Sequence, residues 1–320
     1  MKKIIYSKFG NKDVLQMTDV AIPAFDKTEL LIKVKAVSIN PLDWKIRNGE
    51  MKLMAGKKFP RGIGIDFSGI VEEAGTATTL YKRGDEVFGI LDVFKGAALS
   101  EYIVTNEKDI VIKPANISFE KAAAMPVVGS AAIQIFETLV ALKNGTEVLI
   151  NGASGGIGMF AVQIAKMKGA IVTATTSDTG MEAVKDWGAD LVVNYRKDDV
   201  LKSNKLFDVV IDLSGKVSYN KAKTIMKPAS VYVHTAPGPK EILSSFFINL
   251  FTSRKYKVLM LKPSTAYLEI LAEHAEKGMQ ILINKVYFFD QFNEAFNENA
   301  DRGSAGKSVI CTTGNTSVRL

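Results

Sequence analysis

A glycine-rich turn between an apolar strand and a helix is the feature that most constrains how this chain can fold. An apolar run at residues 148–150 leads into Gly152, Gly155, Gly156 and Gly158, and a helix with apolar side chains at helical spacing begins within these glycines. Glycine permits a tight turn and lets the backbone approach a pyrophosphate, while the helix N-terminus points its N–H groups at that anion. The arrangement predicts dinucleotide binding, with a plain strand-to-helix turn as the alternative.

The segment around this turn alternates strands with helices. A helical stretch is expected at residues 121–142. The strands expected after it are residues 147–151, 171–176, 191–195, 207–213, 230–235 and 257–261, and the helices are residues 156–168, 181–187 and 219–226. Such alternation is typical of a doubly wound parallel sheet of the Rossmann type.

The N-terminal part follows a different pattern. Short segments of alternating polar and apolar residues, divided by Gly and Pro, predict strands at residues 29–38, 63–73, 85–90 and 102–105. These strands favour a barrel-like antiparallel domain. Residues 286–319 return to a mixture of strand and turn, and we expect them to fold back onto this first domain.

Composition excludes several classes of protein. With 320 residues, 47% of them hydrophobic, the chain can form two cores. It contains no apolar run long enough to cross a bilayer, and residues 4–11 lack the apolar stretch of a secretory signal, so we expect a cytoplasmic protein. The net charge of +7 comes from scattered Lys and Arg without an aromatic cluster, which favours a solvated basic surface over a nucleic-acid site.

Cysteine and histidine are scarce. The single cysteine, Cys311, excludes a disulfide within the chain and lies in an apolar run typical of a buried structural thiol. The two histidines, His234 and His274, make a histidine metal site or a Ser-His-acid triad hard to assemble.

The end of the second expected strand bears on which dinucleotide is bound. An NAD enzyme normally places a carboxylate about 20 residues beyond the glycines, and here that position holds Ser177. Ser177, Tyr195 and Arg196 could instead bind a 2′-phosphate. NADPH is therefore predicted, and the neighbouring Asp178 leaves NADH open as the less favoured choice.

Several motifs in fixed order resemble those of one enzyme family. They are residues 38–49 (SINPLDWKIRNG), 64–71 (GIDFSGIV), 82–89 (KRGDEVFG), 122–126 (AAAMP), the glycine loop, 187–190 (WGAD), 286–296 (VYFFDQFNEAF) and 306–310 (GKSVI). Over nearly its whole length the chain resembles zinc-independent medium-chain dehydrogenases/reductases of the quinone oxidoreductase and alkenal (enone) reductase branch. The resemblance implies a GroES-like β-rich catalytic domain from residues 1–120 and 263–320, an inserted doubly wound Rossmann domain at 121–262, and a homodimer.

The resemblance also implies that no metal is bound. The positions that align with zinc ligands of related enzymes hold Asn40, Ile65 and Asp66, and residues 127–129 contain no ligand type. Hydride transfer without a Lewis acid suits an electron-poor acceptor, such as an enal, an enone or a quinone. Asn40 and Lys45 are the candidates for stabilising the developing oxygen anion, and Lys45 is also a candidate proton source.

The residues expected to contact the cofactor lie at strand ends and in the glycine loop. They are Ser130, expected to cap a helix near the phosphates, and Gly152, Ala153, Ser154, Gly155, Gly156, Ile157, Gly158, Thr176, Ser177, Tyr195, Arg196, Leu213, His234, Thr235, Gly306 and Lys307. A non-catalytic NADPH-binding regulatory or structural protein remains the alternative function. The apolar residues 244–251 could cover a substrate cleft, join a subunit interface or touch a membrane.

Overall fold

The computed structural model describes residues 1–298 and 305–312, so the expectation for residues 299–304 and 313–319 lies outside the described part. The chain forms two compact units. Unit 1 comprises Met1–Val127, Pro263–Arg302 and Lys307–Leu320, and unit 2 comprises Val128–Lys262 and Gly303–Gly306.

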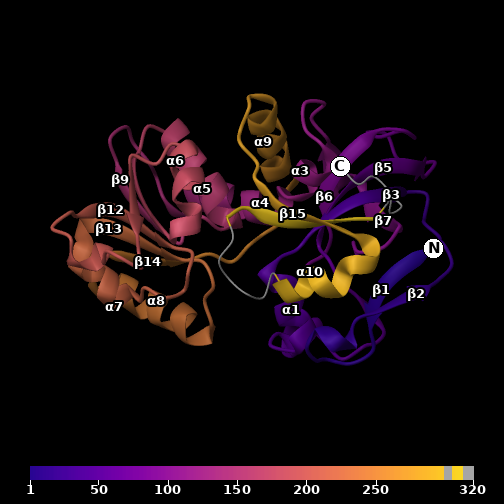
Figure 1. The fold of residues 1–320 in the computed structure, drawn as a ribbon, viewed down its shortest axis with the longest axis horizontal. Coiled ribbons are helices and arrows are strands. Elements are labelled where there is room, and N and C mark those ends of the chain that lie inside the picture. The colour runs from indigo at the N-terminus through magenta and orange to yellow at the C-terminus, as the bar shows by residue number, and fades with distance from the viewer. Residues whose placement is uncertain (299–304, 313–320) are drawn as a thin grey trace. The chain divides into compact units, whose positions relative to one another are not determined.

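Unit 2 is built on a six-stranded parallel sheet (Figure 1). In spatial order its strands are β11 (Leu191–Asn194), β10 (Ile171–Thr176), β9 (Glu147–Asn151), β12 (Phe207–Asp212), β13 (Met226–His234) and β14 (Lys255–Val258). The chain builds outward from β9 to β11 and then returns to the other side of β9. This order confirms the predicted doubly wound sheet, whose strand order reverses between β9 and β12.

Helices cover both faces of this sheet. Figure 1 shows α5 (Gly156–Met167) and α6 (Met181–Asp186) on one side, and α7 (Tyr219–Ala222) and α8 (Pro239–Phe251) on the other. Right-handed crossovers in opposite directions from β9 give this distribution. Within the described residues, no helix combines the length and apolarity needed to span a membrane.

One expected helix is interrupted. The helical stretch expected at residues 121–142 is helical for most of its length but not continuous: the structure has α3 (Phe119–Ala123), α4 (Pro126–Gln134) and a π-helical turn at Ile135–Leu139. Pro126 causes the break, because proline donates no backbone hydrogen bond and restricts the residue before it. The helix expected at 219–226 also ends early, at Ala222, and a 3-10 turn leads into β13.

Unit 1 contains two sheets whose strands pair antiparallel, as expected, apart from one parallel pair at the edge of the larger sheet. The smaller sheet has the order β2 (Gln16–Asp19), β1 (Lys2–Tyr6) and β4 (Arg61–Gly62). The larger sheet contains β15 (Ile283–Phe288), β16 (Lys307–Cys311), β3 (Glu29–Ser38), β5 (Asp66–Ala74), β6 (Glu86–Ile90) and β8 (Ile110–Ile112), with β7 (Tyr102–Asn106) paired to β3. An apolar core that includes Ile32, Phe67 and Tyr287 lies inside unit 1.

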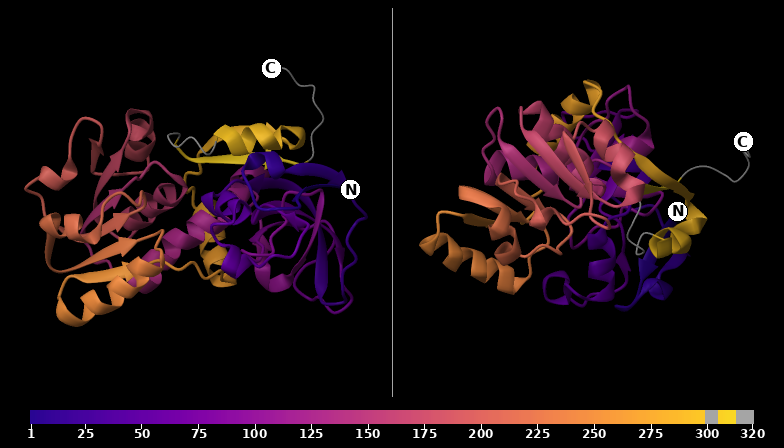
Figure 2. Two further views of the ribbon diagram at one scale, coloured as in Figure 1. Left: turned by 90° about the horizontal axis from the view of Figure 1, so that it is seen from below. Right: turned by 60° about the vertical axis from the view of Figure 1, so that its left-hand side comes forward.

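The C-terminal segment folds back onto the N-terminal strands, as predicted (Figure 2). Strand β16 pairs antiparallel with β3, and Val309 lies opposite Ser38. Strand and turn were expected near residues 292–298, but these residues form helix α10 (Phe292–Glu298), whose Phe292, Ala295 and Phe296 are buried at helical spacing. Cys311 ends β16, and burial raises the pKa of its thiol to about 12, which fits the expected structural role.

Candidate cofactor and active site

The glycine loop has a backbone that only glycine can form at two positions. Gly152 follows β9 with a φ of +83°, in the left-handed region. A Cβ at Gly158 would lie 2.1 Å from the carbonyl oxygen of Ala153, so the first turn of α5 packs directly on the loop. The N-terminus of α5 therefore lies against the chain that leaves β9, which is the arrangement that binds a pyrophosphate in doubly wound sheets.

Polar side chains at the carboxyl ends of three strands hold this loop. The backbone N–H of Ala153 donates to the Thr175 carbonyl at 2.9 Å. The Thr175 hydroxyl donates to Asn151 Oδ1 at 2.5 Å, and Asn151 Nδ2 donates to Asp212 Oδ1 at 2.8 Å. Sequence reasoning missed Asn151, Thr175 and Asp212, although a polar residue that ends an apolar strand could have indicated them.

Three of the expected cofactor residues present buried polar atoms. Thr176 Oγ1, His234 Nδ1 and Ser130 Oγ are buried and have no hydrogen-bond partner among the described residues. Thr176 and His234 end strands β10 and β13, at the same edge of the sheet as the glycine loop. Ser130 lies inside α4 rather than at its start, so the expected capping role is wrong. Since buried polar atoms are normally hydrogen-bonded, this edge is built to receive a polar ligand.

Other expected residues at this edge are held by the backbone. Leu213 N donates to the Asn151 carbonyl at 2.9 Å, and Thr235 Oγ1 donates to the Asp212 carbonyl at 3.0 Å. Gly306 N donates to the Ser154 carbonyl at 2.9 Å, so Gly306 lies directly beside the glycine loop.

The ends of β10 and β11 form a charged corner. Lys197 Nζ lies 3.3 Å and Arg196 Nη1 4.0 Å from the carboxylate of Asp178. The hydrogen bond from Lys197 lowers the pKa of Asp178, so that carboxyl is ionised at neutral pH. Ser177 is buried, with its hydroxyl 3.0 Å from Thr179 Oγ1. Two cations therefore face one anion here, and Lys197 is a residue that sequence reasoning missed.

Tyr195 also belongs to this corner. Its ring is half exposed, and Lys216 Nζ lies 6.0 Å from the ring centroid. The corner thus offers an aromatic face beside three basic side chains.

A buried ionic cluster occupies unit 1, and we name it the Lys307 cluster. Lys307 Nζ donates to Asn40 Oδ1 and to the Ile39 carbonyl, both at 2.6 Å. Asn40 Nδ2 donates to Asp66 Oδ2 at 2.9 Å, and so does the Ser38 hydroxyl, at 2.9 Å. The cluster comprises Ser38, Asn40, Asp43, Asp66 and Lys307, all of them buried. It joins β3, β5, β16 and α1 (Pro41–Asn48).

The cluster holds two carboxyls and one ammonium. Asp43 Oδ2 accepts the Asn40 backbone N–H at 2.7 Å, whereas Asp43 Oδ1 is buried without a partner among the described residues. Burial raises the pKa of Asp43 to about 7 and that of Asp66 to about 6, and Lys307 opposes the rise at Asp66. Burial also lowers the pKa of Lys307. The cluster can therefore hold or release a proton near neutral pH.

The structure places the two expected catalytic residues differently. The Asn40 side chain is fully buried and both of its amide atoms bond inside the Lys307 cluster, which favours a positioning role over direct contact with substrate. Lys45 lies half-buried on α1, and within the described part of the chain its ammonium makes no hydrogen bond or ion pair. Lys307 was expected to contact the cofactor, but its ammonium is hydrogen-bonded inside the Lys307 cluster.

Comparison with known proteins assigns both units. The family model of the alcohol dehydrogenase GroES-like domain matches residues 26–115, and that of the zinc-binding dehydrogenases matches residues 156–297. The chain is 31% identical to the chloroplastic quinone-oxidoreductase homolog of Spinacia oleracea, over 97% of this chain and 98% of that protein. It is 32% identical to the 2-methylene-furan-3-one reductase of Solanum lycopersicum, over 97% of this chain and 79% of that protein.

Two further relatives agree. A mitochondrial NAD(P)H oxidoreductase of Bos taurus is 31% identical over 96% of this chain and 88% of its own length. The solved structure of the quinone oxidoreductase from Coxiella burnetii superposes with a TM-score of 0.89 at 30% identity, covering 98% of this chain and 99% of that one. These matches confirm the GroES-like and Rossmann units. The chain is an oxidoreductase that belongs to the medium-chain dehydrogenase/reductase family, in its quinone oxidoreductase branch.

Proposed function

We propose that this oxidoreductase uses NADPH to reduce quinones or α,β-unsaturated carbonyl compounds without zinc. The observation that supports it most directly is the carboxyl edge of the unit 2 sheet. The glycine loop lies at this edge, and it has no room for a Cβ at Gly158. Thr176 Oγ1 and His234 Nδ1 lie at the same edge, and both are buried atoms that lack partners among the described residues. A nicotinamide dinucleotide fits these groups, because its pyrophosphate suits the start of α5 and its polar atoms suit the strand ends.

When bound, the reduced nicotinamide supplies the hydride and its electron pair. The chain's own task is to orient the cofactor and substrate and to neutralise the charge that develops on the substrate oxygen. We assign the glycine loop and α5 to the pyrophosphate, and Thr176 and His234 to the nucleotide along the sheet edge.

The charged corner supports a preference for NADPH. Ser177 stands where an NAD enzyme places its acid, and Arg196 and Lys197 add two cations beside it. A 2′-phosphate would compete with Asp178 for these cations. Lys197→Met should weaken NADPH binding by about tenfold and leave NADH binding within twofold, as measured by calorimetry. Equal losses for both nucleotides would refute this assignment.

The Lys307 cluster supports a reaction without zinc. Asn40 and Asp66, at two positions that align with zinc ligands, are instead hydrogen-bonded to each other and to Lys307. Across residues 1–298 and 305–312, no three His, Cys, Asp or Glu side chains gather in a way that could hold a metal ion. Dialysis against a chelator should therefore leave turnover unchanged. Loss of activity that zinc restores would contradict the proposal.

Lys45 is our candidate to stabilise the negative charge that develops on the substrate, because its ammonium makes no hydrogen bond or ion pair with the described residues. Lys45→Met should lower kcat by about tenfold while the Kd for NADPH stays within twofold. Lys52→Met, on α2 (Lys52–Ala55), is the matched control, because Lys52 is exposed and also lacks a partner in the described chain. If the two variants behave alike, Lys45 has no part in the chemistry.

The decisive experiment mixes purified protein with NADPH and separate panels of quinones and enones, and follows the absorbance of NADPH. Oxidation with one panel identifies the substrate class. Calorimetric binding of NADPH without turnover on either panel would favour the alternative, a non-catalytic NADPH-binding protein. No binding of either nucleotide would overturn the cofactor assignment itself.

We also propose that the protein is a homodimer through α8. This helix turns its apolar side chains outward: Ser245 is its one buried residue, whereas six large apolar side chains are 40–87% exposed. They are Ile242, Leu243, Phe246, Phe247, Leu250 and Phe251. Asn249 fixes this orientation by bonding both the N–H and the carbonyl of Tyr256 on edge strand β14, at 2.7 and 2.8 Å.

A second copy is the occupant that best fits this face. The face contains no charge, as the centre of a protein interface requires. At about 200 Å² for each aromatic side chain, its three phenylalanines alone expose roughly 400 Å², about half the area that each partner contributes to a stable dimer, and the three aliphatic side chains add to this. Phe246→Ser with Phe251→Ser should give a monomer in sedimentation, whereas Leu53→Ser, at an isolated side chain 95% exposed, should not. A monomeric wild type that cosediments with lipid vesicles would contradict the proposal.

A further inference from the structure

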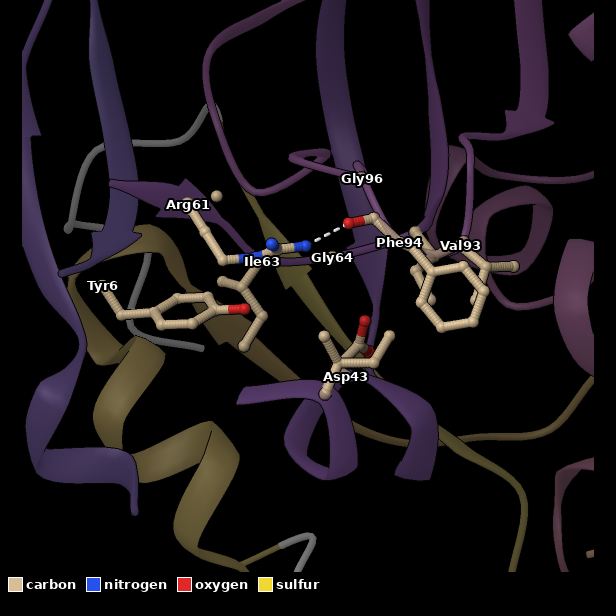
Figure 3. A pocket seen from close by; sticks show the side chains of 11 residues that line it. Tyr6, Asp43, Arg61, Ile63, Gly64, Val93, Phe94 and Gly96 are labelled. Carbon is tan, nitrogen blue, oxygen red and sulfur yellow. Dashed lines mark hydrogen bonds between the residues drawn. The ribbon is translucent and has the colours of Figure 1, made fainter. Parts of the chain in front are cut away.

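A small polar cavity lies inside unit 1, beside the Lys307 cluster. Its volume is about 20 Å³, and its walls include Tyr6, Asp43 and Arg61. Figure 3 shows the Tyr6 hydroxyl, the Arg61 guanidinium and the Asp43 carboxyl around the same space. The pairing of β1 with β4 brings the first two together, because Tyr6 and Arg61 are direct partners across these strands. Asp43 comes from α1.

Three glycines and five apolar residues form the rest of the wall. Gly64 and Gly96 both line the cavity, and a Cβ on Gly96 would lie 2.7 Å from the Gly64 carbonyl oxygen. The backbone of the two glycines is therefore in close contact at this part of the wall. A polar cavity of this volume holds about one oxygen-sized group.

Arg61 carries a charge that the described residues leave uncompensated. Its Nη1 donates to the Ala55 carbonyl at 2.7 Å and its Nη2 to the Phe94 carbonyl, and it makes no ion pair in the described chain. The guanidinium has five N–H donors, so neutral carbonyls leave part of its capacity free.

Asp43 and Tyr6, the other two polar residues that line the cavity, can also donate hydrogen bonds. Asp43 is 3% exposed, and its Oδ1 has no partner in the described part of the structure. Because burial raises the pKa of Asp43 to about 7, a large share of this carboxyl is protonated at neutral pH. Burial also raises the pKa of Tyr6, so the phenol keeps its proton. A guanidinium, a phenol and a carboxylic acid together make a site for an oxygen acceptor.

We propose that this cavity receives the carbonyl oxygen of the substrate, a quinone or an α,β-unsaturated carbonyl compound, and that Asp43 gives that oxygen its proton. The proposal rests on the proposed function. When bound, the reduced cofactor would supply the hydride to the acceptor, and the negative charge would then collect on the substrate oxygen in this cavity. The O–H bond of Asp43 then breaks and a new O–H bond forms on the substrate, which yields the hydroquinone or an enol that tautomerises to the ketone.

The charged groups around Asp43 explain how the proton is restored. Asp66 raises its proton affinity, whereas Lys307 and Arg47 lower it. Arg61 and Tyr6 line the same cavity. Asp43 and Asp66 share the single ammonium of Lys307, so one of the two carboxylates lacks a counter-charge after each turnover. Asp43 then takes up a proton from solvent.

Tyr6→Phe is the sharpest test, because it removes one donor and leaves the ring that packs against Phe59. We expect kcat/KM to fall about tenfold for the active substrate panel, with the Kd for NADPH unchanged. Asp43→Asn should lower kcat about 100-fold and abolish the fall in kcat above about pH 7. Arg83→Met, at an exposed arginine that pairs with Glu72, is the control and should match wild type.

A second measurement does not depend on turnover. Cofactor-free protein is titrated with 1,4-naphthoquinone, and Tyr6→Phe and Arg61→Met should each raise its Kd about tenfold, whereas Arg83→Met should not. Unchanged quinone binding in both cavity variants would overturn the subsite, even if wild type reduces quinones. Conversely, wild type that binds the quinone through Tyr6 but never oxidises NADPH would retain the subsite and refute the proposed function.

Discussion

Replacing Asp43 with asparagine should change how the stability of unit 1 depends on pH. Burial raises the pKa of this carboxyl from 3.8 to about 7, so its protonated form stabilises the folded state. The unfolded chain has lost the proton above about pH 4, whereas the folded chain keeps it until about pH 7. The stabilisation is therefore fully present below pH 4 and is lost as the pH rises through about 7. The amide of the Asp43→Asn variant cannot titrate, so only wild type should show this loss.

The size of the effect follows from the shift. One pKa unit corresponds to about 1.4 kcal/mol, so wild type should lose roughly 2 to 3 kcal/mol relative to Asp43→Asn between pH 5 and pH 7. Urea unfolding followed by tryptophan fluorescence measures it, because the chain contains only Trp44 and Trp187. In a Trp187→Phe background, the remaining Trp44 lies on α1 and reports on unit 1 alone.

Asp85→Asn is the matched control, because its sign is opposite. The hydrogen bond from the Lys82 backbone N–H lowers the pKa of Asp85, so the ionised form stabilises the fold. Its contribution is present above the unfolded pKa and is lost as the pH falls through the folded pKa. The reasoning about the cluster would be refuted if the difference in unfolding free energy between wild type and Asp43→Asn stayed constant with pH while Asp85→Asn behaved as expected.

Three further changes test the two candidate sites. Gly158→Ala should destabilise the protein by about 1–3 kcal/mol and weaken NADPH binding, because its Cβ would lie 2.1 Å from the Ala153 carbonyl oxygen. Gly155→Ala is the control for the same thermal melts and titrations: its Cβ would lie 3.8 Å from the nearest atom, so it should be tolerated. Lys307→Met should cost about 3–5 kcal/mol in urea unfolding, and adding Asp66→Asn should recover part of it; no recovery would mean that the two are not coupled. Ser177→Asp should shift the ratio of kcat/KM towards NADH, through repulsion of a 2′-phosphate, and an unchanged ratio would defeat that assignment.

Local patterns predict unit 2 well and the breaks within it less well. The bounds of β9 and β10 could be predicted to the residue, because apolar runs bounded by turn residues mark buried parallel strands. The long helix expected at 121–142 failed at Pro126, where a covalent restriction outweighs an apolar helical pattern. Helix α10 was missed because only the 3-10 turn Phe289–Gln291 separates it from β15, and that turn contains no Gly or Pro to mark the boundary.

The candidate sites divide in the same way. The glycine loop could be predicted because one continuous segment contains strand, turn and helix, and all of its constraints are local. The Lys307 cluster could not, since Asn40, Asp66 and Lys307 meet only where β3 pairs with both β5 and β16. Tyr6 and Arg61 are harder still, because β4 has two residues and no periodicity, and its register against β1 is set by the fold around it. A lone Tyr or Arg acquires chemical meaning only from such pairing, so sites assembled from distant segments require the three-dimensional structure.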